Sequence, residues 1–559
     1  MNGVVKRAQQ WLAHDPDPAT RAELATVIDA ATRGHADAAA DLSDRFSGPL
    51  EFGTAGLRGA VGAGESRMNV AVIVRTTAGL ASYLRDVVGD DARVVVGCDA
   101  RLGSADFRTA ALGVLDAAGV DVIALPPRLP TPVVAYATRA LNCDAGIMIT
   151  ASHNPAADNG YKVYLGGRAA DTAGRGVQIV SPADADIARH IHAAPPADKV
   201  PMSDAASRTQ VADDVVDAYI DRVASLRSAI SPSPVRVVLT PLHGVGGGIA
   251  TRVLAKAGIA DVHRVVTQFD PDPDFPTVAF PNPEEPGALD AAIALARKTV
   301  ADVVVALDPD ADRCAVAIPG RDGRWRQLSG DEVGALLAEQ AATDPDRAGD
   351  TLACSIVSSR LLAHIAESHG LRHAVTLTGF KWIARTPGLR FGYEEAIGYC
   401  TDPDAVRDKD GISTMIRVLT LVETAAAGGR TLDDLLDDLA RRHGVHATGQ
   451  LSFRVENTDT ITEVMRRLRR DGIDRLAGSA VTEVVDLADG GSLPPTDGLV
   501  FHTADDDRVI IRPSGTEPKL KCYLEVVRPC DDAAAPIPLA AAHNRLATLR
   551  RDVAAALDL

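Results

Sequence analysis

Ser152 stands in a stretch whose pattern is suited to nucleophilic or group-transfer chemistry. Residues 146–150, GIMIT, form a short apolar run that predicts a buried strand, and the polar residues that follow are typical of a loop. The loop at the carboxyl end of a strand in an α/β sheet lies where such folds bind ligands. A turn serine bonded to its own backbone is the alternative. Thr150 and Asn154 replace the glycines of the G-x-S-x-G hydrolase elbow, so we expect no acyl-enzyme.

Three alternating aspartates, Asp308, Asp310 and Asp312, follow a second apolar run at residues 303–307. In an extended loop such carboxylates can converge on one hard cation, such as Mg²⁺. An EF-hand is excluded because Arg313 and Pro319 stand where it needs glycine and glutamate. We expect a cation-binding loop between two strands, with a solvated acidic turn as the alternative.

Four further loops place charged side chains beside glycines, where a cation can reach an anion, and ordinary loop charges are the alternative. Residues 512–519, RPSGTEPK, resemble a phosphate cradle, because glycine lets backbone N–H groups approach and arginine binds phosphate in a bidentate manner. An ordinary turn between strands is the alternative. The charged residues of the four loops are Arg58, Lys381, Glu394, Lys409 and Arg512.

The elements that must position these loops alternate between strand and helix, which predicts parallel α/β sheets. Three α/β segments open comparably at residues 93–99, 235–241 and 350–357, a weak indication of related domains. One or two amphipathic helices are expected in residues 1–45, and a smaller α+β domain after residue 444. We place the domains at 1–205 with the serine loop, 206–320 with the aspartates, 321–444 with the loop of Glu394, and 445–559 with the loop of Arg512.

The composition excludes several classes of protein. The formal net charge is −17, so broad binding to nucleic acid is not expected. No secretory signal or run of 18 apolar residues is present, which predicts a cytoplasmic protein with no membrane partner. The seven cysteines lack C-x-x-C spacing and are expected to be reduced thiols.

Motifs in five of these regions, read in order, resemble the α-D-phosphohexomutase superfamily of phosphoglucomutase and phosphomannomutase. They are FGTAGLRG, TASHNP with NGYK, DPDADR, the GYEEAIG sugar loop and RPSGTEP, and the resemblance extends from residue 50 to about residue 528. It implies an α/β fold of four domains around a central cleft, three of them related mixed-sheet domains and the last an α+β domain.

The resemblance also implies a role for each matching residue. Ser152 would carry a phosphoryl group and, with Asp308, Asp310 and Asp312, would hold Mg²⁺. Arg58 would face the phosphoserine, and His153 and Lys162 are the candidates for the general base. The substrate would contact a set of loop residues, which comprises Arg313, Thr378, Gly379, Lys381, Glu394, Lys409, Arg512, Ser514, Gly515 and Thr516.

The implied activity is that of a phosphosugar mutase, which interconverts glucose or mannose 1-phosphate and 6-phosphate through a bisphosphorylated sugar. Glucose 1,6-bisphosphate, or an equivalent sugar bisphosphate, would be the activator. Ala396 stands where many relatives have serine, and Tyr399 lies near a position where some have histidine, which leaves a phosphopentomutase open. A metal-dependent sugar phosphatase and a non-catalytic sugar-phosphate binder are further alternatives. The oligomeric state cannot be read from the sequence.

Overall fold

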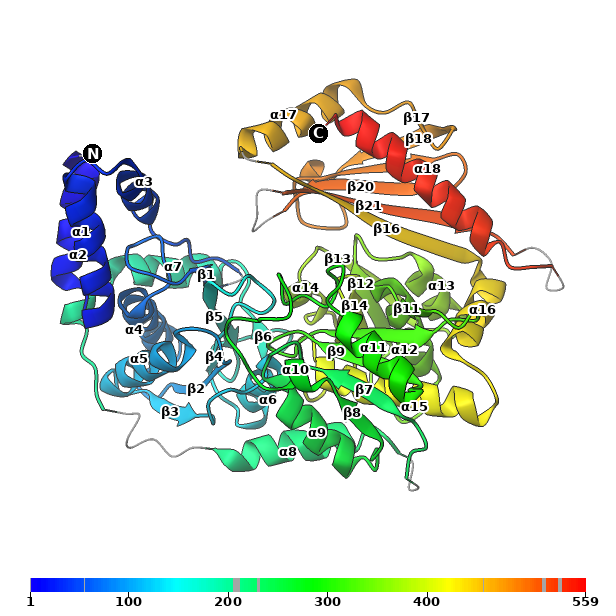
Figure 1. The fold of residues 1–559 in the computed structure, drawn as a ribbon, viewed down its shortest axis with the longest axis horizontal. Coiled ribbons are helices and arrows are strands. Elements are labelled where there is room, and N and C mark those ends of the chain that lie inside the picture. The colour runs from blue at the N-terminus through cyan, green and yellow to red at the C-terminus, as the bar shows by residue number, and fades with distance from the viewer. Residues whose placement is uncertain are drawn as a thin grey trace. The chain divides into compact units, whose positions relative to one another are not determined.

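The computed structural model describes residues 2–54, 56–204, 212–228, 232–455, 457–514, 519–530 and 535–558. The chain divides into two compact units. The first comprises Met1–Leu328, Ala384–Phe391 and Ala396–Glu423, and the second comprises Ser329–Ile383, Gly392–Glu395 and Thr424–Leu559. Each unit is described by itself below (Figure 1).

The first sheet of the first unit contains the Ser152 loop. Its strands are β1 (Leu57–Ala60), β2 (Arg93–Cys98), β3 (Asp121–Ala124), β4 (Ala145–Ile149), β5 (Asp158–Leu165) and β6 (Val177–Gln178), in the order β1-β5-β4-β2-β3 with β6 on β5. β2 runs parallel to β3 and β4, whereas β5 is antiparallel to β4 and β1. The helices of this domain are α4 (Val70–Val87), α5 (Ser104–Ala117), α6 (Thr131–Ala140) and α7 (Ala183–Ala193). The buried valines of β2 are typical of a central strand covered on both faces.

The second sheet, also in the first unit, contains the aspartate loop. Its strands are β7 (Val237–Thr240), β8 (Val262–Arg264), β9 (Val303–Leu307), β10 (Cys314–Pro319) and β11 (Trp325–Gln327), in the order β11-β10-β9-β7-β8. β7 is parallel to β8 and β9, and β10 is antiparallel to β9. Its helices are α8 (Asp213–Ala224), α9 (Gly246–Lys256), α10 (Val266–Phe269) and α11 (Asp290–Thr299). The predicted loop between two strands is therefore the β9–β10 connection.

A third α/β segment follows along the chain. Its elements are α12 (Gly330–Thr343), β12 (Thr351–Ser355), α13 (Leu361–Ser368), β13 (Arg372–Thr376), α14 (Phe380–Ile383), β14 (Leu389–Glu394), β15 (Gly398–Cys400) and α15 (Gly411–Ala427). β12 and β13 pair in parallel. The chain passes from the first unit to the second within β14.

The three α/β segments share one plan. Each opens with a strand, a helix and a parallel partner strand, which are β2-α5-β3, β7-α9-β8 and β12-α13-β13. In each, a later strand leads into a short connection with one non-glycine residue at positive φ: Ser152 (52°), Ala311 (55°) and Ile397 (52°). The indication of three related α/β domains is confirmed at the level of strand order.

The last domain, in the second unit, is an antiparallel sheet with helices, as the predicted α+β class requires. The helix α16 (Leu432–His443) precedes it, and its elements are β16 (Val445–Arg454), α17 (Thr458–Asp471), β17 (Arg475–Leu476), β18 (Ser479–Asp486), β19 (Leu499–Thr503), β20 (Arg508–Pro513), β21 (Lys519–Arg528) and α18 (Leu539–Leu557). The strand order is β16-β21-β20-β19-β18-β17. Leu546, Leu549 and Val553 of α18 join a core with Leu524 and Val526 of β21.

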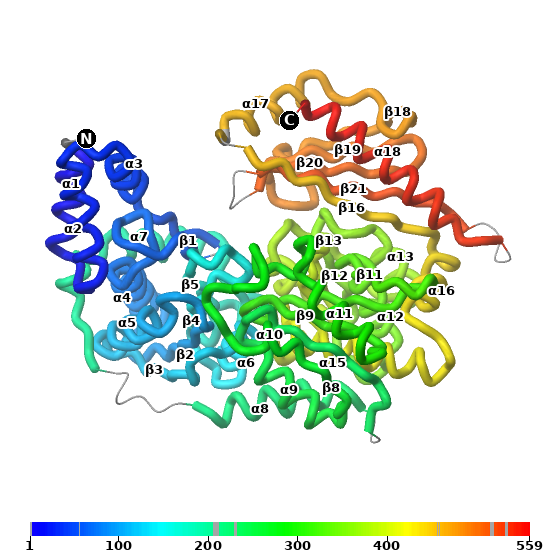
Figure 2. Tube along the Cα trace, in the orientation of Figure 1, coloured from blue at the N-terminus to red at the C-terminus, as the bar shows by residue number. Residues whose placement is uncertain are grey.

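Three helices precede the first sheet, where the sequence predicts one or two. They are α1 (Asn2–His14), α2 (Pro18–Thr32) and α3 (Ala36–Arg45), and Figure 2 shows them side by side. Asp17 caps α2 and Pro18 occupies its first turn, so the chain restarts a helix there. Leu24, Leu42 and Phe46 form their small core. No helix in the described part of the chain is long and apolar enough to cross a membrane.

Candidate active site

The loop between β4 and β5 holds Ser152 in a fixed, buried position. Its backbone has φ of 52°, and its amide donates to Thr150 Oγ1 at 2.9 Å. A non-glycine residue keeps this left-handed backbone conformation only where the surrounding structure holds it there. Such residues often lie in functional loops. Ser152 is 3% exposed, so its hydroxyl must find its partner within the protein.

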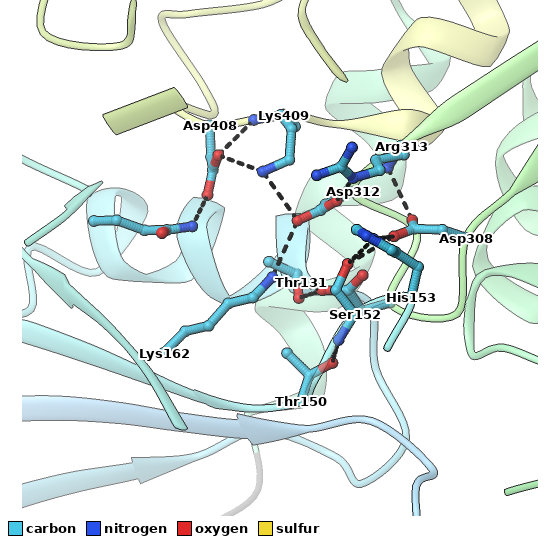
Figure 3. A network of polar contacts seen from close by, with 12 residues as sticks. Thr131, Thr150, Ser152, His153, Lys162, Asp308, Asp312, Arg313, Asp408 and Lys409 are labelled. Atoms are coloured by element: carbon cyan, nitrogen blue, oxygen red, sulfur yellow. Dashed lines mark hydrogen bonds and ion pairs between the residues drawn. The ribbon is translucent and has the colours of Figure 1, made fainter. Parts of the chain in front are cut away.

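That partner is Asp308, at the start of the β9–β10 loop. Ser152 Oγ donates to Asp308 Oδ2 at 2.8 Å, and His153 Nδ1 lies 3.2 Å from the same hydroxyl (Figure 3). His153 Nδ1 is 3.9 Å from Asp308 Oδ2. The structure therefore brings the predicted serine, its neighbouring histidine and the first aspartate into one contact group.

One carboxylate oxygen each of Asp308, Asp310 and Asp312 lies within 4.8 Å of the other two, and the three side chains are buried. Lys162 Nζ contacts Asp310 at 2.7 Å and Asp312 at 3.0 Å. Lys409 Nζ lies 3.1 Å from Asp312 (Figure 3). Two lysines thus offset part of the charge of three converging carboxylates.

The electrostatics of the cluster fit a further cation. Burial, followed by repulsion from Asp310 and Asp312, raises the pKa of Asp308 well above its usual value. Burial opposes ionisation of Asp310 too, but Lys162 outweighs it and the pKa of Asp310 is lowered. Oδ1 of Asp310 and Oδ1 of Asp312 are buried and accept no hydrogen bond from the described residues. Such oxygens, on three convergent carboxylates, match the ligands that Mg²⁺ prefers.

The basic residues around this group are anchored in different ways. Arg313 donates its backbone N–H to Asp308 Oδ1 at 3.0 Å and its Nη1 to the carbonyl of Ala396 at 2.6 Å. Arg58 Nη1 donates to Asn154 Oδ1 at 2.9 Å.

Burial, followed by repulsion from Arg313 and Arg58, lowers the pKa of His153 well below its usual value. Burial also opposes the charge on Lys162, but Asp310 and Asp312 outweigh it and raise its pKa.

Arg101 is a positioning residue that sequence reasoning missed. Its guanidinium donates to four carbonyl oxygens of the serine loop, those of Ser152 (2.6 Å), Asn154 (2.6 Å), Pro155 (2.8 Å) and Asp158 (3.1 Å). It follows β2 in the sequence GCDAR, so its place after a strand was the available signal. These four hydrogen bonds fix the path of the loop that carries Ser152.

Thr131 and Asp408 were also missed. Thr131 Oγ1 donates to Asp310 Oδ2 at 2.6 Å. Asp408 lies 3.3 Å from Lys409 Nζ and accepts bonds from Tyr164 (2.7 Å) and Gln178 (2.8 Å). These contacts hold the aspartate loop and Lys409 against the first sheet. No sequence pattern predicts these contacts, because the partners lie far apart along the chain.

The remaining predicted residues lie in the second unit. Thr378 and Gly379 follow β13, Lys381 is in α14, and Glu394 ends β14. Arg512 is in β20 and Ser514 follows it, with the Ser514 amide donating to the carbonyl of Lys519 at 2.8 Å. Gly515 and Thr516 lie outside the described residues.

Tyr523 links the sugar loop and the phosphate loop within that unit. Burial raises its pKa, as do the nearby carboxylates of Glu395 and Glu394, while a hydrogen bond with Arg512 opposes the shift. Glu395 Oε2 in turn accepts bonds from Ser355 (3.1 Å) and Ser358 (3.2 Å). The acidic end of β14 and the basic end of β20 are therefore neighbours, a relationship that the sequence did not reveal.

Family models match most of the chain in four consecutive segments. Residues 49–194, 217–321 and 329–443 match the alpha/beta/alpha domains I, II and III of phosphoglucomutase/phosphomannomutase, and residues 453–535 match its C-terminal domain. The fold class and the family expected from the motifs are thereby confirmed.

Named relatives and a solved structure support the same family assignment. A probable phosphomannomutase of Haemophilus influenzae is 45% identical, over 82% of this chain and 93% of its own length. A phosphopentomutase of Mus musculus is 34% identical, over 93% of this chain and 90% of its own. The structure of a putative phosphomannomutase from Thermus thermophilus aligns with a TM-score of 0.69 and 25% identity, covering 90% of this chain and 99% of that one. The chain belongs to the phosphoglucomutase/phosphomannomutase family, and it is an intramolecular phosphotransferase of the isomerase class.

Proposed function

We propose that phosphorylated Ser152 exchanges its phosphoryl group with a sugar phosphate, interconverting glucose or mannose 1-phosphate and 6-phosphate. The observation that carries the proposal is the 2.8 Å bond from Ser152 Oγ to Asp308, within a cluster of three carboxylates. A phosphoserine carries about −1.5 to −2 charges at neutral pH, so it requires cations at this place. Lys162, Arg313 and Arg58 supply them from the protein.

In the first half-reaction the bond between phosphorus and Ser152 Oγ breaks, and a bond from phosphorus to the free sugar hydroxyl forms. The base takes the hydroxyl proton and gives it to the leaving Ser152 Oγ, and the product is a bisphosphorylated sugar. In the second half-reaction the bond between the other phosphorus and its sugar oxygen breaks, and that phosphoryl group is transferred to Ser152 Oγ. The base takes the serine proton and gives it to the freed sugar oxygen. No phosphate is released to water.

His153 is favoured over Lys162 as the base. The lowered pKa of His153 leaves its imidazole neutral at pH 7, able to accept a proton. The raised pKa of Lys162, and its contacts with Asp310 and Asp312, keep its ammonium group charged. Lys162 therefore suits a structural and charge-balancing role.

A Mg²⁺ ion would be held by Asp308, Asp310 and Asp312 together with Ser152. When bound, it supplies positive charge to the phosphoryl oxygens during transfer. The buried, unbonded oxygens of Asp310 and Asp312 support this assignment.

The phosphate that does not react would be held by the loop of Arg512, Ser514, Gly515 and Thr516. Glu394 would accept hydrogen bonds from ring hydroxyls, with Thr378, Gly379, Lys381 and Lys409 as further contacts. Tyr523 interacts with both Arg512 and Glu394, which supports a common role for the phosphate loop and the sugar loop. The bisphosphate must bind in two orientations, so these contacts must serve both.

A phosphopentomutase, acting on ribose or deoxyribose 1-phosphate and 5-phosphate, is the second candidate. The likeness to the Mus musculus phosphopentomutase favours it, because that match covers more of this chain than the match to the Haemophilus influenzae protein. The two candidates share the phosphoserine chemistry and differ in the sugar.

Phosphorus NMR tests the function and ranks the substrates. The purified protein would be incubated with Mg²⁺, a trace of glucose 1,6-bisphosphate, and equal amounts of glucose, mannose and ribose 1-phosphates. We expect conversion to a 6-phosphate or 5-phosphate without free phosphate. Accumulating inorganic phosphate would instead indicate a phosphatase, and no change would indicate a non-catalytic binder.

A further inference from the structure

A pocket of about 580 Å³ in the first unit lies apart from the Ser152 site. It is lined by the end of α6, by Asn142 before β4, by Gly166 after β5, by Arg175, by Arg222 of α8 and by Asp404. Because β4 and β5 are antiparallel, Asn142 and Gly166 lie at one end of this strand pair, and the Ser152 loop lies at the other. Five residues of β4 separate the two ends by roughly 15 Å at about 3.3 Å per residue.

The pocket carries an excess of positive charge. Its lining includes Arg139, Arg175 and Arg222 but one acidic residue, Asp404. Arg222 is paired with Asp402 at 2.7 and 2.8 Å. Arg139 donates to two backbone carbonyls, those of Arg175 (2.7 Å) and Asp404 (3.1 Å). Two of the three guanidinium groups, those of Arg139 and Arg175, thus have no carboxylate within ion-pair distance among the described residues.

The other lining groups suit a sugar. Tyr136 offers an aromatic ring, and Asn142 and Asp404 offer amide and carboxylate groups for hydroxyls. Arginine binds phosphate with two parallel hydrogen bonds, and pockets of 300 to 1,000 Å³ are typical of small-molecule sites. We propose that this pocket is a second binding site, which takes a phosphorylated sugar as an effector.

The lining is connected to the active site through residues 402–410. Arg139 bonds the backbone of Asp404, and Arg222 bonds the side chain of Asp402. The same segment ends with Asp408 and Lys409, and Lys409 contacts Asp312. A phosphate that draws Arg139 or Arg222 toward the pocket alters the restraints on this segment. The regulatory part of the inference rests on the proposed role of Lys409 in substrate binding, whereas the binding part does not.

Calorimetric titration with glucose 1,6-bisphosphate and Mg²⁺ tests the binding, in chains that carry Ser152→Ala so that no phosphoryl group is transferred. We expect two sites per chain. Arg175→Glu should weaken one of them at least tenfold, since it replaces an exposed cation of the pocket by an anion. Arg297→Glu, an equal change of charge at an exposed position of α11, should weaken neither. Arg512→Glu should weaken the other site.

The outcomes separate this inference from the proposed function. A single site that Arg512→Glu removes and Arg175→Glu leaves intact would overturn the second site while supporting the first. A single site that Arg175→Glu removes would support the pocket and count against the phosphate cradle. In chains with Ser152, added bisphosphate should shift the KM for sugar 1-phosphate, and Arg175→Glu should reduce that shift to the part that comes from bisphosphate bound at the active site. An equal shift in both chains would overturn the regulatory part.

Discussion

Ser152 Oγ donates a 2.8 Å hydrogen bond to Asp308 Oδ2, although the two residues are 156 positions apart and follow strands of different sheets. Ser152 follows β4 and Asp308 follows β9, which occupy the same place in their sheets, beside β2 and β7, the first strands of the shared strand-helix-strand plan. Related domains thus present their equivalent loops to each other. In the proposed function the serine would supply a carrier oxygen, and the aspartate loop would supply the charge that a cation binds.

Asp310→Asn should weaken the metal site without changing its shape. The substitution removes one of three carboxylate charges and leaves an oxygen for Thr131. We expect the Mg²⁺ concentration for half-maximal mutase activity to rise at least tenfold, because hard cations depend on carboxylate ligands. Asp322→Asn, in an exposed turn, is the control. An unchanged Mg²⁺ requirement would remove Asp310 from the metal site.

Arg101→Lys should impair turnover more than substrate binding. Lysine keeps the charge but cannot span four carbonyl oxygens, so the Ser152 loop loses its fixed path. We expect kcat to fall at least tenfold with KM nearly unchanged, since small misplacements of reacting groups cost large factors in rate. Arg85→Lys, at an exposed site with a single carbonyl partner, should have no effect. A rise in KM with kcat intact would contradict the positioning role.

His153→Gln should lower kcat by about 100-fold or more, the contribution typical of a general base. In the wild type, activity should persist as the pH falls to 6.5 and disappear at lower pH, because the pKa of His153 is depressed. The variant should lose this acidic limb of the profile. A pH–rate profile of kcat/KM for both chains measures the effect. An unchanged acidic limb in the variant would assign the titration to another group.

The buried position of Asp410 predicts that the free energy of unfolding depends on pH. Its Oδ1 accepts bonds from Tyr219 (2.9 Å) and from the amides of Ile412 and Ser413, whereas its buried Oδ2 has no partner among the described residues. Burial raises its pKa to about 6. A raised folded-state pKa gives a stabilisation that is complete below the unfolded value of about 3.8 and is lost as the pH rises through 6.

Asp410→Asn abolishes this titration and keeps the acceptor for Tyr219. The free energy of unfolding of the variant, relative to the wild type, should therefore increase by about 2.5 kcal/mol between pH 4 and pH 7.5, since one pKa unit corresponds to about 1.36 kcal/mol and the unfolded carboxyl is already partly ionised at pH 4. Urea unfolding at several pH values measures it. Asp290→Asn, at an exposed position, is the control. A difference that does not vary with pH would contradict the assignment.

The sequence predicted the loops better than the contacts between them. Apolar runs followed by polar residues located the connections after β4 and β9, because a buried strand and a turn differ sharply in composition. The division of the N-terminal segment into three helices was missed, although Pro16 and Gly34, residues that break helices, stand in the two linkers. The pairing of Lys162 and Lys409 with Asp312 could not be predicted either, because contacts between side chains far apart along the chain produce no local sequence pattern.

Arg101 shows why a positioning residue is harder to find than a reacting one. Its acceptors are backbone carbonyls, which every residue has, so its partners place no signature in the sequence. Ser152 and the aspartates have side chains whose chemistry limits the possible interpretations. The metal and phosphoserine roles of these residues remain predictions.

The most direct test is whether a phosphoryl group passes through Ser152. The protein would be incubated with glucose 1,6-bisphosphate and Mg²⁺, freed of small molecules and analysed by mass spectrometry of the peptide that contains residue 152. We predict one phosphoryl group on Ser152, which disappears on addition of a sugar 1-phosphate as a sugar bisphosphate forms. A phosphoryl group on another residue, or sustained turnover by Ser152→Ala, would contradict the account.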